Sequence, residues 1–284
     1  MVVKTTRQSR KIRREDTGAS MRLSTTTNPN PPITTSIILW RLRYGEIPTS
    51  YKVNKDGLCV HCNGSGYINE KNFGKLRCLC QLINYTIPDI ISTFGEIRTD
   101  FPSGNIERLI EWSGSNLANK EIAELKTVVR KWEHYPKGWL TIIGRPGTGK
   151  TEIMTWLAKR LYPWALYITD PNFESIIHNA LNKEVPKKSY NNIIYAIQRA
   201  PILLYDDYGS GYGSKFSASS LRSVIDWRYA NHSEYLTVVT SNLSRAKLKM
   251  LDPRIADRIL DQDRAQVVVL QNVDSWRTRD DNSK

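Results

Sequence analysis

Apolar residues recur through the second half of the chain in short runs, and longer amphipathic stretches separate them. Runs of this length, bounded by polar turns, are typical of buried strands. Between them, apolar residues fall at helical spacing, as in residues 152–161. Strands that alternate with helices predict an α/β fold in which a five-stranded parallel sheet is covered by helices. The five predicted strands are residues 139–143, 166–168, 202–205, 236–239 and 267–270.

The first of these strands continues directly into the sequence GRPGTGKT, residues 144–151. Glycines let backbone N–H groups turn inward around an anion, and a helix that begins at the same point adds the positive end of its dipole. The spacing is that of a Walker A phosphate-binding loop, in which Lys150 reaches the outer phosphates and the hydroxyl of Thr151 holds Mg²⁺. The sequence therefore predicts an ATP–Mg²⁺ site whose ligands include Gly144, Pro146, Gly147, Thr148, Gly149, Lys150 and Thr151.

Polar residues follow two further predicted strands. Asp206 and Asp207 come directly after residues 202–205, and Asn242 follows residues 236–239. Because ligands of parallel sheets gather at the carboxyl ends of the strands, we expect these side chains beside the phosphate loop. We predict that Asp206 contributes to the Mg²⁺ shell and that Asp207 polarises the attacking water. The amide of Asn242 is expected to reach the same water or the terminal phosphate, so the pattern predicts an ATPase.

The segment LDPRIADRILD, residues 251–261, predicts a helix that Asp252 caps and that has Pro253 in its first turn. Arg254 and Arg258 fall four residues apart on one outward face, while the isoleucines of the segment turn toward the core. This spacing is compatible with ordinary surface charge and also with arginines that reach the γ-phosphate of a neighbouring subunit.

All four cysteines lie within residues 59–80. Cys59 and Cys62 form one closely spaced pair, and Cys78 and Cys80 form a second. Two such pairs joined by a loop predict a four-sulfur structural Zn²⁺ site that leaves no open position for catalysis. His61 is an alternative to one of the sulfurs. A disulfide is disfavoured because the cytosol keeps thiols reduced.

The chain of 284 residues has a formal net charge of +13 and a pI near 9.6, which predicts a polyanionic partner such as DNA. Residues 1–43 hold nine lysines and arginines against Glu15 and Asp16. Few large apolar residues accompany them, so we expect a disordered basic arm over residues 1–35. Three interpretations of this arm stay open: an arm along nucleic acid, a solvated tail or an organellar transit peptide. A translation start at Met21 would make residues 1–20 dispensable.

The predicted organisation has four parts. The basic arm, residues 1–35, precedes a zinc-binding module at residues 36–87, which is too short to hold a core without a metal. Residues 88–136 form a linker with a helix at 117–132, and residues 137–284 form the ATPase domain. No apolar run is long enough to cross a bilayer, and no secretory signal is present. We therefore expect no membrane partner and a cytoplasmic protein of a bacterial or phage-infected cell.

Five stretches of residues 137–277 resemble the AAA+ P-loop ATPases: GRPGTGKT, ILLYDDYG, VVTSN, RIADRILD and DSWR. Within that class they are similar to the DnaC/DnaI type of replicative-helicase loader and to the related IstB-type transposition ATPases. The resemblance implies that Arg258 is an arginine finger acting on an adjacent subunit, with Arg254 as its rival. It also implies that Asn242 is the first sensor and Arg277 the second, although DSWR has tryptophan where the family has tyrosine.

Two functions follow from the resemblance. The first is a helicase loader that binds ATP–Mg²⁺ and single-stranded DNA, assembles through the Arg258 face, presents the zinc module to a replicative helicase and releases it on hydrolysis. The alternative is a transposition regulator that assembles on duplex DNA and recruits a transposase or target-selection protein. A third class, a zinc adaptor without enzymatic activity, conflicts with the intact Lys150, Thr151, Asp206 and Asp207.

Overall fold

The computed structural model describes residues 52–70, 74–83, 116–134, 138–161, 164–181, 188–211 and 213–275. The predicted basic arm, residues 1–35, and the predicted second sensor, Arg277, lie outside the described residues. The limits of the four predicted parts stay predictions.

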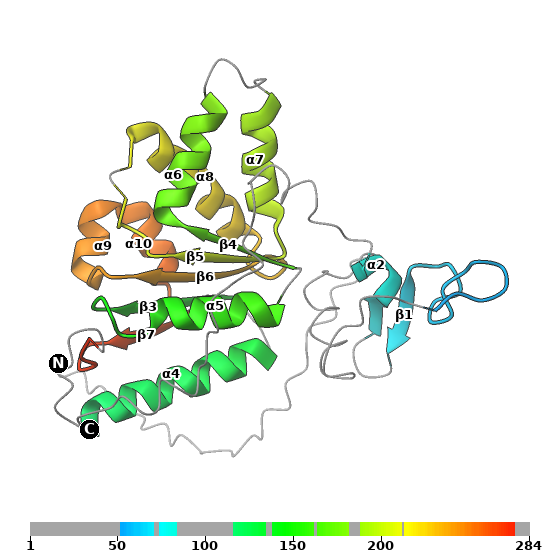
Figure 1. Cartoon of the computed structure of the whole chain (residues 1–284), viewed down its shortest axis with the longest axis horizontal. Helices are drawn as coiled ribbons and strands as arrows, with labels where there is room; N and C mark the ends of the chain where they lie inside the picture. The colour runs from blue at the N-terminus through cyan, green and yellow to red at the C-terminus, as the bar shows by residue number, and fades with distance from the viewer. Residues whose placement is uncertain are drawn as a thin grey trace, which may run out of the picture.

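A five-stranded parallel sheet forms the centre of the ATPase domain, as the alternation of apolar runs predicted (Figure 1). Each observed strand contains its predicted run and extends it by one or two residues at one or both ends. In spatial order the strands are β4 (Ala165–Thr169), β5 (Ile202–Asp206), β6 (Leu236–Ser241), β3 (Trp139–Gly144) and β7 (Ala265–Leu270).

Helices cover both faces of this sheet (Figure 1). One face packs against α4 (Asn116–His134) and α5 (Lys150–Leu161). The other face packs against α6 (Asp170–Leu181), α7 (Lys188–Arg199), α8 (Lys215–Ala230), α9 (Arg245–Leu251) and α10 (Pro253–Ile259). The predicted helix at residues 117–132 is therefore the longer α4, whose buried residues recur at helical spacing.

The alternation of side chains along β5 determines on which face of the sheet Asp206 lies. Ile202 and Leu204 belong to the apolar cluster under α4 and α5, whereas Leu203 and Tyr205 belong to the cluster on the opposite face. Successive side chains of a strand point to opposite faces. Asp206 therefore continues the α5 side, where the helix that follows the phosphate loop begins.

A buried arginine joins three elements on the far face of the sheet. Arg228 of α8 is fully buried, and among the described residues no carboxylate accepts its hydrogen bonds. Its guanidinium donates to backbone oxygens near the end of α7 and at the start of β6, and to one hydroxyl on β6. These acceptors are the carbonyl groups of Ile197, Gln198, Ala200 and Leu236, and Oγ1 of Thr237.

The cysteine module contains an antiparallel hairpin and a short helix. Strand β1 (Tyr67–Glu70) pairs with β2 (Gly74–Arg77), and α2 (Leu79–Ile83) follows. Its first cysteine pair follows a tight turn in which Oδ1 of Asn54 accepts the N–H groups of Asp56 and Leu58 at 3.0 and 2.9 Å. In the described parts of the chain, no helix has both the length and the apolar character that a membrane span requires.

Candidate functional site

The phosphate loop connects β3 to α5 and is organised around Lys150. Its Nζ donates to the carbonyl oxygens of Gly144 and Arg145, each at 2.8 Å, and lies 3.3 Å from Oγ1 of Thr148. Gly147 has a φ of +81°, a backbone conformation that side chains with a Cβ rarely adopt. The glycines, the lysine and the start of a helix thus meet in the arrangement that the Walker A spacing predicted.

The segment after β7 packs directly on this loop. A Cβ placed on Gly147 would lie 2.0 Å from Oγ of Ser275 and 3.1 Å from its Cα. A Cβ on Gly144 would lie 2.9 Å from the Cβ of Leu270. Gly144 therefore allows the last residue of β7 to lie close to the loop, and Gly147 does the same for Ser275.

Asp206 ends β5 in the centre of the site and is almost completely buried, at 2% exposure. The hydroxyl of Tyr167 on β4 donates to its Oδ2 at 2.8 Å, and Oγ1 of Thr240 on β6 donates to its Oδ1. Burial and the charge of Asp206 raise the pKa of Tyr167, so this hydroxyl stays protonated as a donor. The two strands that flank β5 thus fix both oxygens of the carboxylate.

Asp207 leaves the strand with a φ of +61°, an uncommon value for a residue other than glycine. Its N–H donates to Oγ1 of Thr240 at 2.9 Å, and Nδ2 of Asn242 donates to its Oδ1. The amide that sequence reasoning placed near the attacking water therefore contacts the carboxylate predicted to polarise that water. The two residues lie 35 positions apart in the sequence.

Burial raises the pKa of Asp207, and the negative charge of Asp206 adds to the shift. A hydrogen bond from Ser210 and the positive charge of Lys150 oppose it. Since Lys150 acts on Asp207, the phosphate loop and the acidic pair share one electrostatic environment. This is the environment expected of a carboxylate that binds a proton more readily than an exposed one.

Asp170, at the start of α6, holds the turn that follows the acidic pair. Its Oδ2 accepts the N–H groups of Gly209 and Gly211 at 3.1 and 3.0 Å, and its Oδ1 accepts the hydroxyl of Tyr205 at 2.5 Å. The first residue of α6 therefore fixes the direction in which the chain continues after Asp207.

The two candidate finger residues lie on α10, whose N-cap is Asp252 as predicted. Nε of Arg258 is 2.8 Å from Oδ1 of Asp226 on α8, and Nη2 of Arg254 is 3.5 Å from Oδ2 of the same carboxylate. The side chain of Arg258 is 23% exposed and lies over the ring of Tyr229, whereas that of Arg254 is 66% exposed. Arg258 is thus held within its own subunit, and Arg254 projects further.

The four cysteines form a second candidate site. All are free and buried, and their sulfur atoms lie within 4.8 Å of one another. Sγ of Cys59 is 3.8 Å from that of Cys78, and Sγ of Cys62 is 3.6 Å from that of Cys80. A tetrahedral Zn²⁺ with Zn–S bonds of about 2.3 Å requires S–S edges of about 3.8 Å. The cluster therefore fits zinc, and the exposed His61 is outside the group of four ligands.

Burial raises the pKa of Cys80 to about 12 and raises that of Cys78 as well. At Cys62 burial is outweighed by hydrogen bonds, led by the one from the backbone of Gly66, which together lower the pKa of its thiol. The thiols of Cys78 and Cys80 are therefore the ones whose protons burial retains. Zinc binding would displace those protons, which couples the folding of the module to the metal.

Sequence reasoning missed four residues that shape the site: Tyr167, Asp170, Asp226 and Thr240. Tyr167 lies inside a predicted strand, where an aromatic residue ordinarily indicates packing. Asp226 lies inside a helix, where a charge ordinarily indicates a solvated face. A signal was available for Asp170 and Thr240, because each lies within two residues of the carboxyl end of a predicted strand.

The parallel sheet and the glycine loop between β3 and α5 give the chain the α/β fold of a P-loop nucleotide-binding protein. Residues 105–283 match the model of the IstB-like ATP binding protein family, which is more than half of the chain. The chain therefore belongs to the family of IstB-like ATP binding proteins. No curated protein matches the chain.

Solved structures with a similar fold include replication proteins. Domain III of the replication initiation protein DnaA from Thermotoga maritima is 19% identical, with a TM-score of 0.48 over 61% of this chain and 69% of that chain. AMPPCP-bound DnaA from Aquifex aeolicus is 17% identical, with a TM-score of 0.47 over 62% of this chain and 52% of that chain. The DnaC helicase loader is 16% identical, with a TM-score of 0.43 over 61% of this chain and 99% of that chain. The chain thus spans about half of the length of the Aquifex aeolicus protein.

Proposed function

We propose that this chain is an ATP-hydrolysing loader that delivers a replicative DNA helicase to DNA. The observation that supports it most is the meeting of Lys150, the acidic pair and Asn242 at one edge of the sheet. Binding energy for phosphates and a means of activating water are then available in the same place.

In this proposal Lys150 binds the outer phosphates, and Thr151 and Asp206 hold Mg²⁺. A hydroxyl and a carboxylate are hard oxygen donors of the kind that Mg²⁺ prefers. The ion supplies charge stabilisation at the phosphates when it is bound. Asp207 polarises the attacking water, and the hydrogen bond from Asn242 orients its carboxylate.

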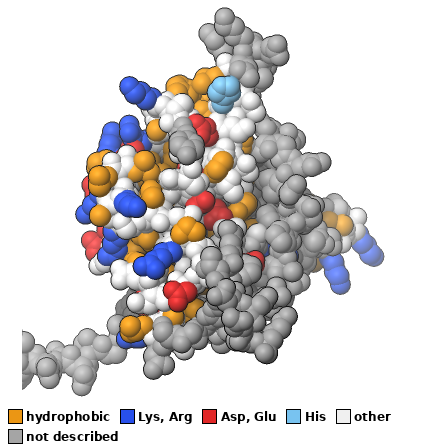
Figure 2. Space-filling view, turned by 60° about the vertical axis from the view of Figure 1, so that its left-hand side comes forward, with side chains coloured by type: hydrophobic (Ala, Val, Ile, Leu, Met, Phe, Trp, Pro, Cys, Tyr) orange, Lys and Arg blue, Asp and Glu red, His pale blue; other side chains and the backbone are white. Residues whose placement is uncertain are grey.

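DNA is the proposed polyanion, with single-stranded DNA favoured over duplex. The net charge of +13 supports a phosphate-rich partner. Helix α9 contributes to it, because Arg245, Lys247 and Lys249 are all exposed and the helix has no acidic residue. Figure 2 brings the side of α9 and α10 forward and shows lysines and arginines interspersed with apolar side chains there. Met250 of α9 is 85% exposed.

The cysteine module is proposed to bind one structural Zn²⁺ through Cys59, Cys62, Cys78 and Cys80 and to contact the helicase. Its sulfur geometry supports the metal. Its position ahead of the ATPase domain supports the contact, since a separate folded unit offers a surface that the nucleotide site does not occupy.

A second candidate is a transposition regulator that assembles on duplex DNA and recruits a transposase or a target-selection protein. The match of residues 105–283 to the IstB-like ATP binding protein family favours it. Both candidates use the same nucleotide site and the same homo-oligomer through the Arg258 face. They differ in the DNA form and in the partner.

One experiment separates the candidates. We expect the purified chain to hydrolyse ATP with Mg²⁺ and DNA, and Lys150→Ala to lose nucleotide binding. Asp207→Asn, which should bind ATP without hydrolysing it, is then used to capture partners from the native host. A helicase in the bound fraction supports the loader, and a transposase supports the regulator. A wild-type chain without affinity for ATP–Mg²⁺ contradicts both, and so does a fraction with neither partner.

A further inference from the structure

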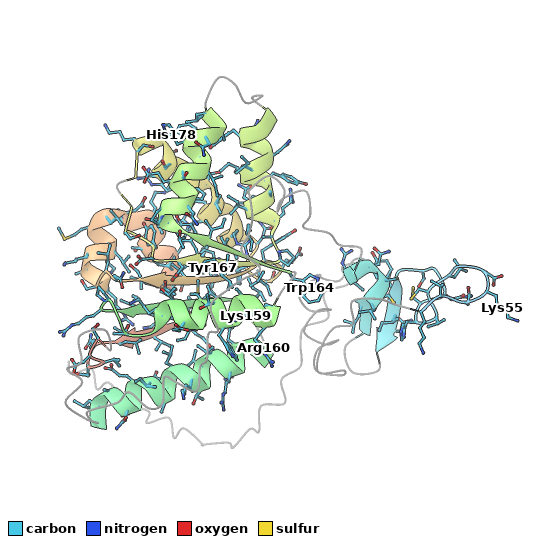
Figure 3. All side chains as sticks on the ribbon, viewed as in Figure 1. Lys55, Lys159, Arg160, Trp164, Tyr167 and His178 are labelled. Carbon is cyan, nitrogen blue, oxygen red and sulfur yellow. The ribbon has the colours of Figure 1, made fainter. Side chains whose placement is uncertain are left out.

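Tyr167 lies on the edge strand β4, on the face of the sheet that α5 covers (Figure 3). Its ring is partly buried against the apolar cluster under that helix. Its hydroxyl leaves the cluster and reaches Oδ2 of Asp206 on the neighbouring strand at 2.8 Å. An apolar residue would fill the same space, so packing alone does not require the hydroxyl.

Asp206 is held from both sides by hydroxyl groups. Thr240 on β6 donates to Oδ1, and Tyr167 on β4 donates to Oδ2. An ionised carboxylate has about four lone-pair positions, so two remain for further ligands. At 2% exposure Asp206 has little access to bulk water that could replace either donor. Its orientation therefore depends on these two bonds.

The two donors are not equivalent. Oγ1 of Thr240 also accepts the N–H of Asp207, so a change at Thr240 disturbs both acidic residues. The hydroxyl of Tyr167 donates to Asp206, the first residue of the acidic pair. Removing the Tyr167 hydroxyl thus takes a bond from Asp206 and leaves the hydrogen bonds of Asp207 with Thr240 and Asn242 in place.

We propose that Tyr167 is a positioning residue for magnesium: its hydroxyl orients Asp206 so that the free lone pairs of the carboxylate face the ion beside the phosphate loop. The inference rests on the proposed function and deepens it at the same site. Outer partners of metal ligands commonly change metal affinity by about 10- to 100-fold when they are removed. Tyr167 does not touch the nucleotide in this proposal, and it acts only through Asp206.

The test compares Tyr167→Phe with wild type in equilibrium binding of a fluorescent ATP analogue, titrated with Mg²⁺ and repeated in EDTA. We expect the Mg²⁺ concentration at half-saturation to rise about tenfold. Binding in EDTA should not change, because Lys150 and the glycine loop remain intact. The matched control is Tyr190→Phe, which also removes a hydroxyl hydrogen bond, to Oγ of Ser220 at 2.9 Å, on the opposite face of the sheet. That control should bind Mg²⁺ and nucleotide as wild type does.

A double-mutant cycle shows whether Tyr167 acts through Asp206. Asp206→Asn should weaken the Mg²⁺ dependence strongly, and adding Tyr167→Phe to it should produce no further change. Equal losses with and without Mg²⁺ overturn the proposal, as does an additive effect in the cycle or a Tyr167→Phe titration that matches wild type. A wild-type chain that binds no ATP–Mg²⁺ overturns the proposed function and this inference together, whereas normal wild-type binding with an unaffected Tyr167→Phe overturns the inference alone.

Discussion

Several backbone positions in the nucleotide site have dihedral angles that most residues avoid, among them Gly147, Gly149 and Asp207. Gly147 has a φ of +81° and Asp207 a φ of +61°. Each lies where a chain reverses direction at the end of a buried strand, with a functional group in the reversal. Such conformations cost about 1–3 kcal/mol for a residue with a Cβ and persist only where the surroundings enforce them. At Asp207 the N–H bond to Thr240 provides that constraint.

Gly147→Ala should weaken nucleotide binding by at least about tenfold and lower the free energy of unfolding by about 1–3 kcal/mol. The added Cβ would overlap Oγ of Ser275 at 2.0 Å in a backbone conformation already strained for alanine. Titration calorimetry and urea unfolding measure the two effects. Gly213→Ala is the matched control, since a Cβ there meets no atom within 4 Å. Equal behaviour of the two variants would contradict the close contact between the loop and Ser275.

The pH dependence of turnover should report Asp207. Its carboxylate must be ionised to polarise water, and burial raises its pKa. Activity should therefore be lost as pH falls through that raised pKa, at higher pH than for an ordinary aspartate. Steady-state rates between about pH 4 and pH 9 locate this acidic limb.

Ser210→Ala removes a hydrogen bond that lowers the pKa of Asp207 and should move the limb to higher pH. Because Ser210 is exposed, the variant should unfold at the wild-type temperature. An acidic limb at the same pH in both proteins would show that another group controls the rate.

At the scale of elements, the side chain of Arg228 connects α8 to α7 and β6 through hydrogen bonds. Arg228 supplies donors to four carbonyl groups and a hydroxyl inside the domain. Three of the carbonyl groups lie at or just after the C-terminal end of α7, where a helix leaves its acceptors unpaired and favours positive charge. Burial nevertheless lowers the pKa of Arg228 to about 9, so these contacts offset a real desolvation cost.

Arg228→Ala should lower the free energy of unfolding by about 3 kcal/mol or more, because several buried acceptors lose their donor. Arg228→Lys keeps the charge but has fewer donors in a different geometry, and it should lie between wild type and alanine. Urea unfolding gives the values, with the exposed Arg245→Ala as control. If Arg228→Ala were as stable as that control, water would have to satisfy the carbonyl groups.

Motifs that lie within a short stretch of sequence made most elements predictable, together with the part of the site that such motifs form. The phosphate loop, the acidic pair and the cysteine spacing each lie within a short stretch whose chemistry needs those residue types, and all five strands follow apolar runs. The partners that orient them are distant in sequence: Tyr167 and Asp206 are 39 residues apart, and Thr240 and Asp206 are 34 apart. Strand order alone brings them together, because β4 and β6 flank β5. Apolar runs predict that a sheet forms, but they do not specify the order of its strands.

At the scale of the whole molecule, the cysteine module and the ATPase domain should depend on different interactions. The two large apolar clusters consist entirely of residues from α4 and the ATPase domain. In the described part of the module, four buried cysteines and two leucines are the buried apolar residues, which is too few to stabilise a fold without a metal.

Removing zinc should therefore unfold the module and leave nucleotide binding intact. We expect about one equivalent of Zn²⁺ per chain, released by a strong chelator or lost in Cys78→Ser. Metal analysis, circular dichroism and nucleotide binding measure the effects, and capture of the partner should fall in parallel. His61→Ala, which removes an exposed side chain outside the ligand group, should keep its zinc. Loss of nucleotide binding on chelation would contradict the separation of the two sites.

Assembly should bring an arginine of one subunit to the phosphates of the next, and the structure makes the choice of arginine testable. Asp226 pairs with both candidates, more closely with Arg258. If Arg258 is the finger, Arg258→Ala should bind ATP normally as a monomer and lose at least about a hundredfold in DNA-stimulated turnover. Mixing it with Lys150→Ala should restore activity, because one subunit supplies the intact phosphate loop and the other the arginine. Arg254→Ala, treated in the same way, is the matched comparison. The variant that is inactive alone and regains activity with Lys150→Ala identifies the finger. Full activity of both arginine variants alone would show that neither arginine acts across the interface.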